Sequence, residues 1–320
     1  MFVERRVTLG KSPLSVVPLG VGCWAWGDER FWRYDQSYGA RDVLAAFTAS
    51  ISIGLDLFDT AEAYGWGKSE RLLGRLRRSS PRPLAMATKY APLAGRGGPA
   101  AIAKALAASR SRLGVESLDL YQLHWADRDE VPIEATMEVL ADAVERGEVR
   151  AVGVSNFRAA EMRQAHAALA RRGVPLASNQ VRYSLLDRSP EDNGVLAACD
   201  ELEVTLLAYS PLAQGLLTGK YSPAQLPSDG RAATSPFQPG NVAAAAPLLE
   251  VLAAIATARR ASPAAVALAW LLAKPGVVPI AGAKDALQVR NNAQALHLRL
   301  DDGELARLDL ASASCQPEKG

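Results

Sequence analysis

The sequence has no long, uninterrupted apolar segment. None of its stretches approaches the roughly 18 uncharged apolar residues that a membrane-spanning helix needs. The opening residues, MFVERRVTLGK, are charged and have no apolar centre of the kind found in a signal peptide. We therefore expect no membrane partner and a cytoplasmic location.

Cysteine is scarce and a strong net charge is absent. Cys23, Cys199 and Cys315 are odd in number and widely spaced, which favours reduced thiols over a disulfide framework or a metal centre. The net charge is +2, and the short basic runs RLRR and ARR are typical of solvated helix faces or ends. Nucleic acid is therefore not an expected partner.

Short apolar runs alternate with helix-length segments along all 320 residues. The strand candidates are rich in Val, Leu and Ile without apolar/polar alternation, which is typical of parallel strands buried on both faces. Eight such strands, each followed by a helical pattern, predict one (β/α)8 barrel domain over residues 1–320, which we expect to be a monomer. The strand candidates are VVPLGVGCW, GLDLFDT, LAMATKY, LDLYQLHW, VRAVGVSN, LASNQVRYS, VTLLAYSPL and GVVPIAGAK.

Two segments fall outside this alternation. The opening VERRVTLGKSPLSVVPLG, with Gly10 and Lys11 at its centre, predicts a β-hairpin that plugs the barrel floor. The segment from Pro211 to about Asn241, after the seventh strand, is rich in Pro, Gly and Ser, and an extra helix is predicted after it. A loop of this length is usually functional, and it leaves the barrel on the side where a ligand would bind.

The stretch DTAEAYG places Asp59 and Tyr64 just beyond the second predicted strand. Lys89 ends the third strand and His124 the fourth. Each residue alone has a structural interpretation, as a helix cap, a solvated charge or a core histidine. In a (β/α)8 barrel, however, side chains at the carboxyl ends of the strands surround one pocket, so the four are expected to meet.

This combination suits proton donation to a carbonyl group. A free phenol, with a pKa near 10, is a weak acid at neutral pH. We expect the Lys89 ammonium to lower the pKa of Tyr64, Asp59 to hold Lys89 in place, and His124 to hydrogen-bond the carbonyl oxygen. Such a site cannot supply hydride, so reduction would require a cofactor.

The later strand ends carry groups suited to a dinucleotide. Tyr209 offers a flat face for a nicotinamide ring, while Ser155, Asn156 and Gln180 offer partners for its carboxamide. At the eighth strand, IAGAK exposes backbone before a helix, where barrels often bind phosphate. An adenosine 2′-phosphate would be held there by side chains following this strand, namely Lys284, Gln288, Arg290 and Asn292.

These residues and their neighbours resemble the aldo-keto reductase superfamily over nearly the whole chain. LFDTAEAYG, ATK, DLYQLHW, VGVSN, SNQVRYS, LLAYSPLAQGLLTGKY and VPIAGAK look like its signatures in its order, and some segments look closest to an uncharacterised cyanobacterial and plastid branch. The resemblance implies a TIM barrel that reduces small aldehydes or ketones with NADPH, with Tyr64 as general acid completed by Asp59, Lys89 and His124.

The resemblance also implies the remaining binding residues. Those expected at the cofactor are Gly22, Cys23, Trp24, Ser155, Asn156, Gln180, Tyr209, Ser210, Pro211, Leu212, Gly215, Lys220, Gly282, Ala283, Lys284, Gln288, Asn291 and Asn292. Those expected to face the substrate are Trp24, Trp26 and Trp125, with ordinary packing as the alternative for Trp26. Ala281, Arg290 and Asn291 depart from the family pattern, which leaves the preference for NADPH over NADH open.

Two other functions remain as alternatives. A lysine at a strand end can attack a carbonyl, so Lys89 could form a Schiff base in an aldolase. The chain could instead be a redox-sensing module that binds NADPH and acts through a protein partner, because such members of the superfamily retain the same four residues.

Overall fold

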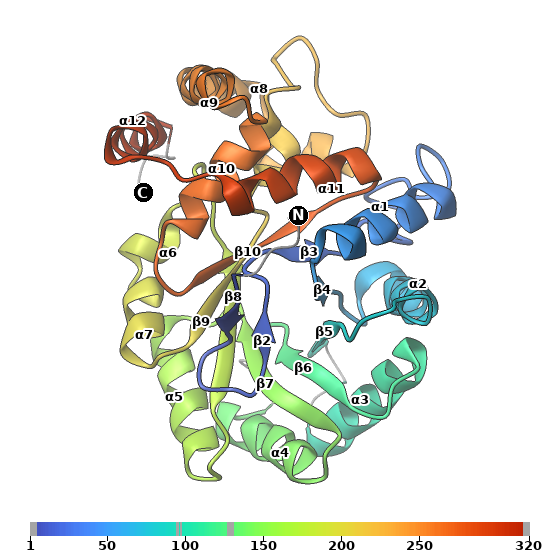
Figure 1. Cartoon of the computed structure of the whole chain (residues 1–320). Coiled ribbons are helices and arrows are strands. Elements are labelled where there is room, and N and C mark those ends of the chain that lie inside the picture. Colours follow the sequence, from blue (N-terminus) through green and yellow to red (C-terminus); the bar gives the residue numbers. More distant parts are fainter. Residues whose placement is uncertain (1–4, 94–95, 97, 127–130, 316–320) are drawn as a thin grey trace.

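A closed barrel of eight parallel strands forms the centre of the molecule in this computed structural model (Figure 1). The structure describes residues 5–93, 96, 98–126 and 131–315. The strands follow chain order around the barrel, and the last pairs with the first, so the predicted (β/α)8 architecture is confirmed. The strands are β3 (Gly20–Gly22), β4 (Leu57–Asp59), β5 (Ala85–Tyr90), β6 (Leu118–Leu123), β7 (Val149–Ser155), β8 (Leu176–Arg182), β9 (Thr205–Tyr209) and β10 (Val277–Gly282).

Helices surround this barrel because the outer faces of its strands are apolar and need cover. The start of α10 follows the residue preferences of helix N-termini. Ser262 caps it by accepting a hydrogen bond from the Ala265 N–H, and Pro263 occupies its first turn. The helices between or after strands are α1 (Ala40–Ile53), α2 (Lys68–Arg77), α3 (Pro99–Leu113), α4 (Ile133–Glu145), α5 (Ala159–Ala170), α6 (Ser189–Asp192), α7 (Val195–Glu201), α10 (Pro263–Leu272), α11 (Ala286–Ala293) and α12 (Asp302–Ala313).

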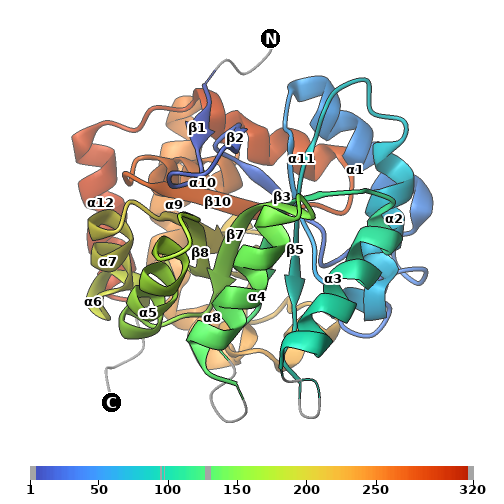
Figure 2. The ribbon, with the colours of Figure 1, turned by 90° about the horizontal axis from the view of Figure 1, so that it is seen from below.

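The N-terminal hairpin closes one end of the barrel, as Figure 2 shows. Its strands β1 (Val7–Thr8) and β2 (Ser15–Val16) pair antiparallel across a turn at Gly10. The fully buried Leu9 packs in one cluster with inward-facing barrel residues such as Leu57 and Leu120. The predicted hairpin at the barrel floor is therefore confirmed.

The long segment after β9 is built from short turns rather than regular structure. It contains the 3-10 helices η2 (Ala213–Thr218), η3 (Gly230–Ala233) and η4 (Ser235–Phe237), followed by α8 (Pro239–Ala244) and α9 (Ala246–Arg259). The extra helix predicted after this loop is thus present. Within the described residues no single helix is long and apolar enough to cross a membrane; α9 and α10 reach that length only together, across a 94° bend.

Candidate active site

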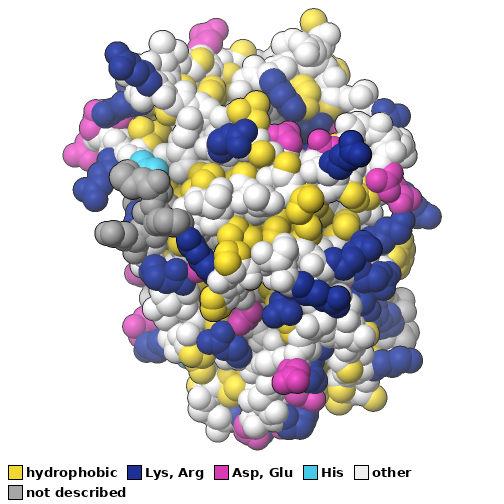
Figure 3. Space-filling model, turned by 45° about the vertical axis from the view of Figure 1, so that its right-hand side comes forward, with side chains coloured by type: hydrophobic (Ala, Val, Ile, Leu, Met, Phe, Trp, Pro, Cys, Tyr) yellow, Lys and Arg dark blue, Asp and Glu magenta, His cyan; other side chains and the backbone are white. Residues whose placement is uncertain are grey.

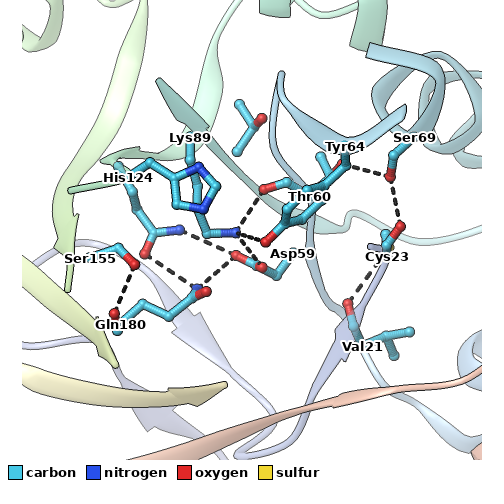
Figure 4. Close-up of polar contacts among 12 residues, drawn as sticks. Val21, Cys23, Asp59, Thr60, Tyr64, Ser69, Lys89, His124, Ser155 and Gln180 are labelled. Carbon is cyan, nitrogen blue, oxygen red and sulfur yellow. Dashed lines mark hydrogen bonds and ion pairs between the residues drawn. The ribbon is translucent and has the colours of Figure 1, made fainter. Parts of the chain in front are cut away.

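Four ionisable side chains meet at the carboxyl end of the barrel strands (Figure 4). Asp59 is the last residue of β4, Lys89 lies near the end of β5, and His124 directly follows β6. Tyr64 opens the 3-10 helix η1 (Tyr64–Gly67), which leads into α2. The structure therefore brings together the four residues that the strand-end pattern singled out.

Lys89 is at the centre of this arrangement and is completely buried. Its ammonium donates to Asp59 Oδ1 at 2.5 Å, to the Thr60 carbonyl oxygen at 2.9 Å and to the Tyr64 hydroxyl at 3.4 Å. Burial alone would lower the pKa of Lys89, but Asp59 and Tyr64 outweigh it and raise this pKa above its usual value. The side chain is therefore a protonated ammonium with all three N–H groups in use.

Two glutamines complete the coordination of the Asp59 carboxylate. Asp59 Oδ2 accepts hydrogen bonds from Gln180 Nε2 at 2.9 Å and from Gln122 Nε2 at 3.2 Å. These bonds fix the orientation of the carboxylate towards Lys89. Gln122 was not among the predicted site residues, although it lies two residues before His124 on β6 and so faces the same side of the strand.

Tyr64 keeps its proton at neutral pH. Burial raises the pKa of Tyr64, the Lys89 charge lowers it, and Asp59 raises it again, so that the net direction is upward. Lys89 does lower the pKa of Tyr64, as expected, but the desolvation of the phenolate is the larger effect and sets the net direction. Since the hydroxyl oxygen accepts from Lys89, its own O–H is left to donate elsewhere.

His124 is uncharged at neutral pH. Burial, followed by the nearby Lys89 ammonium, lowers the pKa of His124 to about 3. Its ring meets the Tyr64 ring edge to face, with 5.9 Å between centroids. Its Nδ1 is buried and has no hydrogen-bond partner among the described residues. A neutral imidazole beside the phenol can thus form a hydrogen bond with a third group without adding charge.

Aromatic rings form one wall beside Tyr64. The Trp24 ring stacks on Tyr64 at 5.9 Å and on Phe31 at 4.7 Å, while Trp32 meets Trp24 edge to face at 5.4 Å. On the other side, Trp125 lies 4.8 Å from the His124 ring. Trp24 and Trp125 therefore lie beside Tyr64 and His124, and their contact with a substrate stays a prediction.

Trp26 does not belong to this wall. Its side chain is fully buried against Phe58, and its Nε1 donates to the Ala283 carbonyl oxygen at 2.8 Å. The prediction that Trp26 faces the substrate is thus not supported, and the alternative of ordinary packing describes it. An indole between two strand ends satisfies its N–H on the neighbouring backbone instead of lining a cavity.

The residues predicted for a nicotinamide lie together on β7, β8 and β9. Ser155 Oγ donates to the Gln180 carbonyl oxygen at 2.8 Å, and the Tyr209 hydroxyl donates to Asn156 Oδ1 at 3.0 Å. Asn156 has a left-handed backbone, with φ of 58°, which turns its side chain back over the strand end. Gln180 differs from the prediction in that its amide N–H group is already engaged by Asp59.

The loop after Tyr209 begins with a series of left-handed residues. Ser210, Ala213, Gln214 and Gly215 all have positive φ, between 46° and 104°. Within this turn the Ala213 and Gly215 N–H groups donate to the carbonyl oxygens of Ser210 and Leu212, at 2.8 and 2.9 Å. In the same segment, Pro211 and Leu212 are buried, while the Lys220 ammonium lies over the Tyr221 ring at 4.8 Å.

The predicted adenosine end is assembled where β10 meets α11. Lys284 N donates to Gln288 Oε1 at 2.9 Å, and Asn292 Nδ2 donates to the Gly282 carbonyl oxygen at 3.3 Å. The neighbouring Asn291 uses its carbonyl oxygen to accept from Ser262. Gly22 ends the adjacent β3 and pairs with Gly282. The fully buried Cys23 follows it, and its N–H donates to the Asp59 carbonyl oxygen at 2.8 Å. This bond links the region to Asp59.

The Lys284 side chain connects this end to the long loop. Its ammonium lies over the rings of Tyr38 and Trp32, at 4.4 and 4.7 Å, and 3.8 Å from Asp229 Oδ2. Burial, followed by the charge of Arg231, lowers the pKa of Lys284 to about 8. Asp229 and Arg231 were not predicted at the site, because nothing in the loop sequence shows which of its residues turn back onto β10.

At the carboxyl ends of the barrel strands, a buried, protonated lysine thus links a carboxylate to a phenol, beside a neutral histidine. The chain belongs to the aldo/keto reductase family, whose model matches residues 18–313. Oxidoreductase activity on carbonyl compounds is the general chemistry of this family.

Named relatives extend over the same length. The chain is 38% identical to the chloroplastic pyridoxal reductase of Arabidopsis thaliana, over 96% of this chain and 86% of that protein. It is 30% identical to an NADH-specific methylglyoxal reductase of Escherichia coli, over 94% and 96%. Among solved structures, the glycerol dehydrogenase of Gluconobacter oxydans superposes with a TM-score of 0.83 at 28% identity, over 96% of this chain and 95% of that one.

Proposed function

We propose that this protein reduces an aldehyde or ketone to an alcohol with NADPH, and that Tyr64 is the proton donor. The observation that carries the proposal is the direction of the hydrogen bonds around Lys89: the ammonium is oriented by Asp59 and donates to the Tyr64 oxygen. As a carbonyl oxygen takes the proton of Tyr64, the phenolate that forms would be stabilised by an ammonium already in contact with it.

His124 completes this proposal from the opposite side of the substrate. A neutral imidazole facing the phenol can hydrogen-bond the carbonyl oxygen, orient it towards Tyr64 and stabilise the charge that develops on it. A protonated imidazole would compete with Tyr64 as acid, and the pKa of about 3 excludes that form at neutral pH. The phenol therefore supplies the proton while the imidazole positions the carbonyl.

The residues at the strand ends fit a nicotinamide dinucleotide. The loop that begins at Ser210 would lie along the pyrophosphate, and Lys284 offers a partly buried cation for a 2′-phosphate. When bound, such a cofactor supplies the hydride. Tyr209 would hold the nicotinamide face, Ser155 and Asn156 its carboxamide, and Gln288 and Asn292 the adenosine. Gln180 would act through Asp59, which its amide orients.

The aromatic wall favours a flat substrate. The rings of Trp24 and Trp125 lie next to Tyr64 and His124, and stacking on them would hold a planar aldehyde with its carbonyl towards both. Pyridoxal, which the name of the Arabidopsis relative specifies for that enzyme, is an aldehyde of this shape. Aromatic aldehydes, pyridoxal among them, are therefore the substrate class that we propose.

Replacement of Tyr64 by Phe tests the proposed proton donor. We expect Tyr64→Phe to lower kcat for an aromatic aldehyde at least about 100-fold, which is the usual contribution of a general acid, with the Kd for NADPH changed less than twofold. NADPH oxidation and fluorescence titration measure these quantities. Tyr121→Phe is the matched control, because the Tyr121 hydroxyl is buried elsewhere and has no partner among the described residues. Equal turnover by Tyr64→Phe and Tyr121→Phe would refute the proposal.

The structure argues against the aldolase alternative. A Schiff base forms from a free amine that can reach a carbonyl. Lys89 is completely buried and protonated, and each of its three N–H groups already has a partner. The sensing-module alternative stays a prediction.

A further inference from the structure

The basic run RLRR lies at the exposed end of α2, as expected, and two of its arginines, Arg75 and Arg78, also line a groove on the outside of the barrel. This groove encloses about 520 Å³ between α2, the end of α3 and the loop after β3. Its basic residues are Lys68, Arg71, Arg75, Arg78 and Arg112, against two carboxylates, Glu29 and Asp35. Five cations against two carboxylates make the lining of this groove locally positive.

Four of these cations form a single stripe. Lys68, Arg71, Arg75 and Arg78 are spaced three or four residues apart, so that they lie on one face of α2 and its C-cap. All four side chains are exposed. The face that carries α2 is brought forward in Figure 3, where Lys and Arg side chains gather in a band. Like charges at this spacing repel each other, so the stripe is unfavourable without a counter-charge.

The protein neutralises only part of this stripe. Lys68 pairs with Glu29, and Arg71 donates to the Trp66 carbonyl oxygen at 3.1 Å. Neither Arg75 nor Arg78 has a hydrogen bond or ion pair through its guanidinium in the described part of the chain. The guanidinium groups of Arg75 and Arg78 thus remain free to bind an anion in the groove.

The shape of the groove is set by close helix packing. A Cβ on Gly74 would lie 2.7 Å from the carbonyl oxygens of Arg112 and Leu113, so only glycine lets α2 approach α3 this closely. This contact places Arg112, held by Glu70 and Ser109, beside the stripe. Tyr34, whose ring is buried, lines the opposite wall.

We propose that this groove binds a small molecule carrying two or more phosphate groups. Arginine guanidinium groups match phosphate oxygens in paired hydrogen bonds. The stripe from Lys68 to Arg78 extends roughly 15 Å at the rise of an α-helix, which suits several linked or separated phosphates better than a single one. The volume lies within the range of small-molecule sites, about 300–1,000 Å³. The groove is built on α2 and is distinct from the strand-end site of Lys284.

Inorganic tripolyphosphate is the probe for this proposal. Isothermal titration of the full-length protein, in a Lys284→Gln background that removes the cation of the strand-end site, should give saturable binding with one ligand per chain. Arg75→Gln combined with Arg78→Gln should weaken this binding at least tenfold. The matched control is Arg299→Gln with Arg307→Gln, two exposed arginines near and on α12, which should leave the affinity within twofold.

Titrations with two further ligands, and the comparison of the two double variants, distinguish binding in the groove from general attraction to surface charge. Inorganic phosphate should bind far more weakly than tripolyphosphate, and ATP should bind comparably to or more tightly than tripolyphosphate if its base reaches Tyr34. An equal loss of affinity in the two double variants would mean that only general surface charge attracts the probe, and this result would overturn the proposal. Absence of saturable binding up to 10 mM probe would overturn it as well, since the substitutions are at exposed positions that do not affect folding.

Discussion

Lys284 is the residue whose ionisation links the candidate site to pH. Its pKa of about 8 means that the ammonium predominates below that pH and is lost as the pH rises above it. NADPH differs from NADH by one 2′-phosphate, which stays a dianion throughout this range. If Lys284 binds that phosphate, the preference for NADPH falls as the pH rises from 7 to 9.

Fluorescence titration of both cofactors at several pH values checks this prediction. The ratio of the NADH and NADPH dissociation constants should decrease severalfold between pH 7 and pH 9 in the native protein. In Lys284→Gln it should be smaller and independent of pH, whereas Lys11→Gln, an exposed cation on the hairpin, should behave like the native protein. A ratio that is unaffected by the Lys284 substitution would assign the phosphate to other residues.

At the scale of residues, the sequence predicted which side chains meet but not the net direction in which their pKa values shift. Asp59, Lys89 and His124 end strands, and barrel geometry alone brings strand ends together. The net direction of the Tyr64 pKa depends on burial, which no spacing reveals. Gln122 was not predicted, because a buried glutamine in a strand has no distinctive pattern. Its spacing of two residues from His124 does place both side chains on the same side of the strand.

At the scale of elements, regular segments were predictable and polar or irregular ones were not. The bounds of α2 could not be predicted, because KSERLLGRLR has only three leucines among charged residues and glycine. The segment EDNGVLAACDELE has the length and composition of one helix, yet the chain forms α6 and α7 on either side of Gly194, where φ is 80°. In both cases tertiary packing decided the outcome over local composition.

The long loop after β9 depends on one arginine. Arg231 forms two hydrogen bonds with the Asp229 carboxylate and donates to the Gln214 carbonyl oxygen at 2.9 Å. Its guanidinium also lies 5.1 to 5.8 Å from the centroids of three rings, those of Trp32, Tyr221 and Phe237. The arginine therefore joins both ends of the loop to the aromatic wall, in a way that no sequence pattern indicated.

Replacement of Arg231 by Met should loosen this loop selectively. The substitution removes both guanidinium hydrogen bonds from the partly buried Asp229 carboxylate, and the loss should appear as local opening. Hydrogen–deuterium exchange should increase at least tenfold over residues 213–237 and remain unchanged in the barrel strands. Arg299→Met is the control for loss of an exposed arginine. Uniform protection in Arg231→Met would show that the loop is held by other contacts.

At the scale of the whole molecule, the two ends of the barrel differ in the residues that they carry. At the carboxyl end, polar and ionisable groups gather in the candidate site. At the other end the hairpin covers an apolar interior, in which Leu9 and Leu14 pack on residues from β4, β5, β6 and β9. The hairpin thus belongs to the core although its two strands are only two residues each.

Truncation of Leu9 tests whether closing this end stabilises the barrel. Leu9 is fully buried, so Leu9→Ala removes apolar contacts and leaves a cavity between the hairpin and the strands, which typically costs about 2–5 kcal/mol. Urea unfolding should show this loss, whereas Leu310→Ala, at a leucine that is 74% exposed, should change stability by about 0.5 kcal/mol or less. Similar midpoints for the two variants would mean that the hairpin lies on a barrel already stable without it. A large loss confined to Leu9→Ala would instead establish that the closed end supports the strands whose opposite ends carry Asp59, Lys89 and His124.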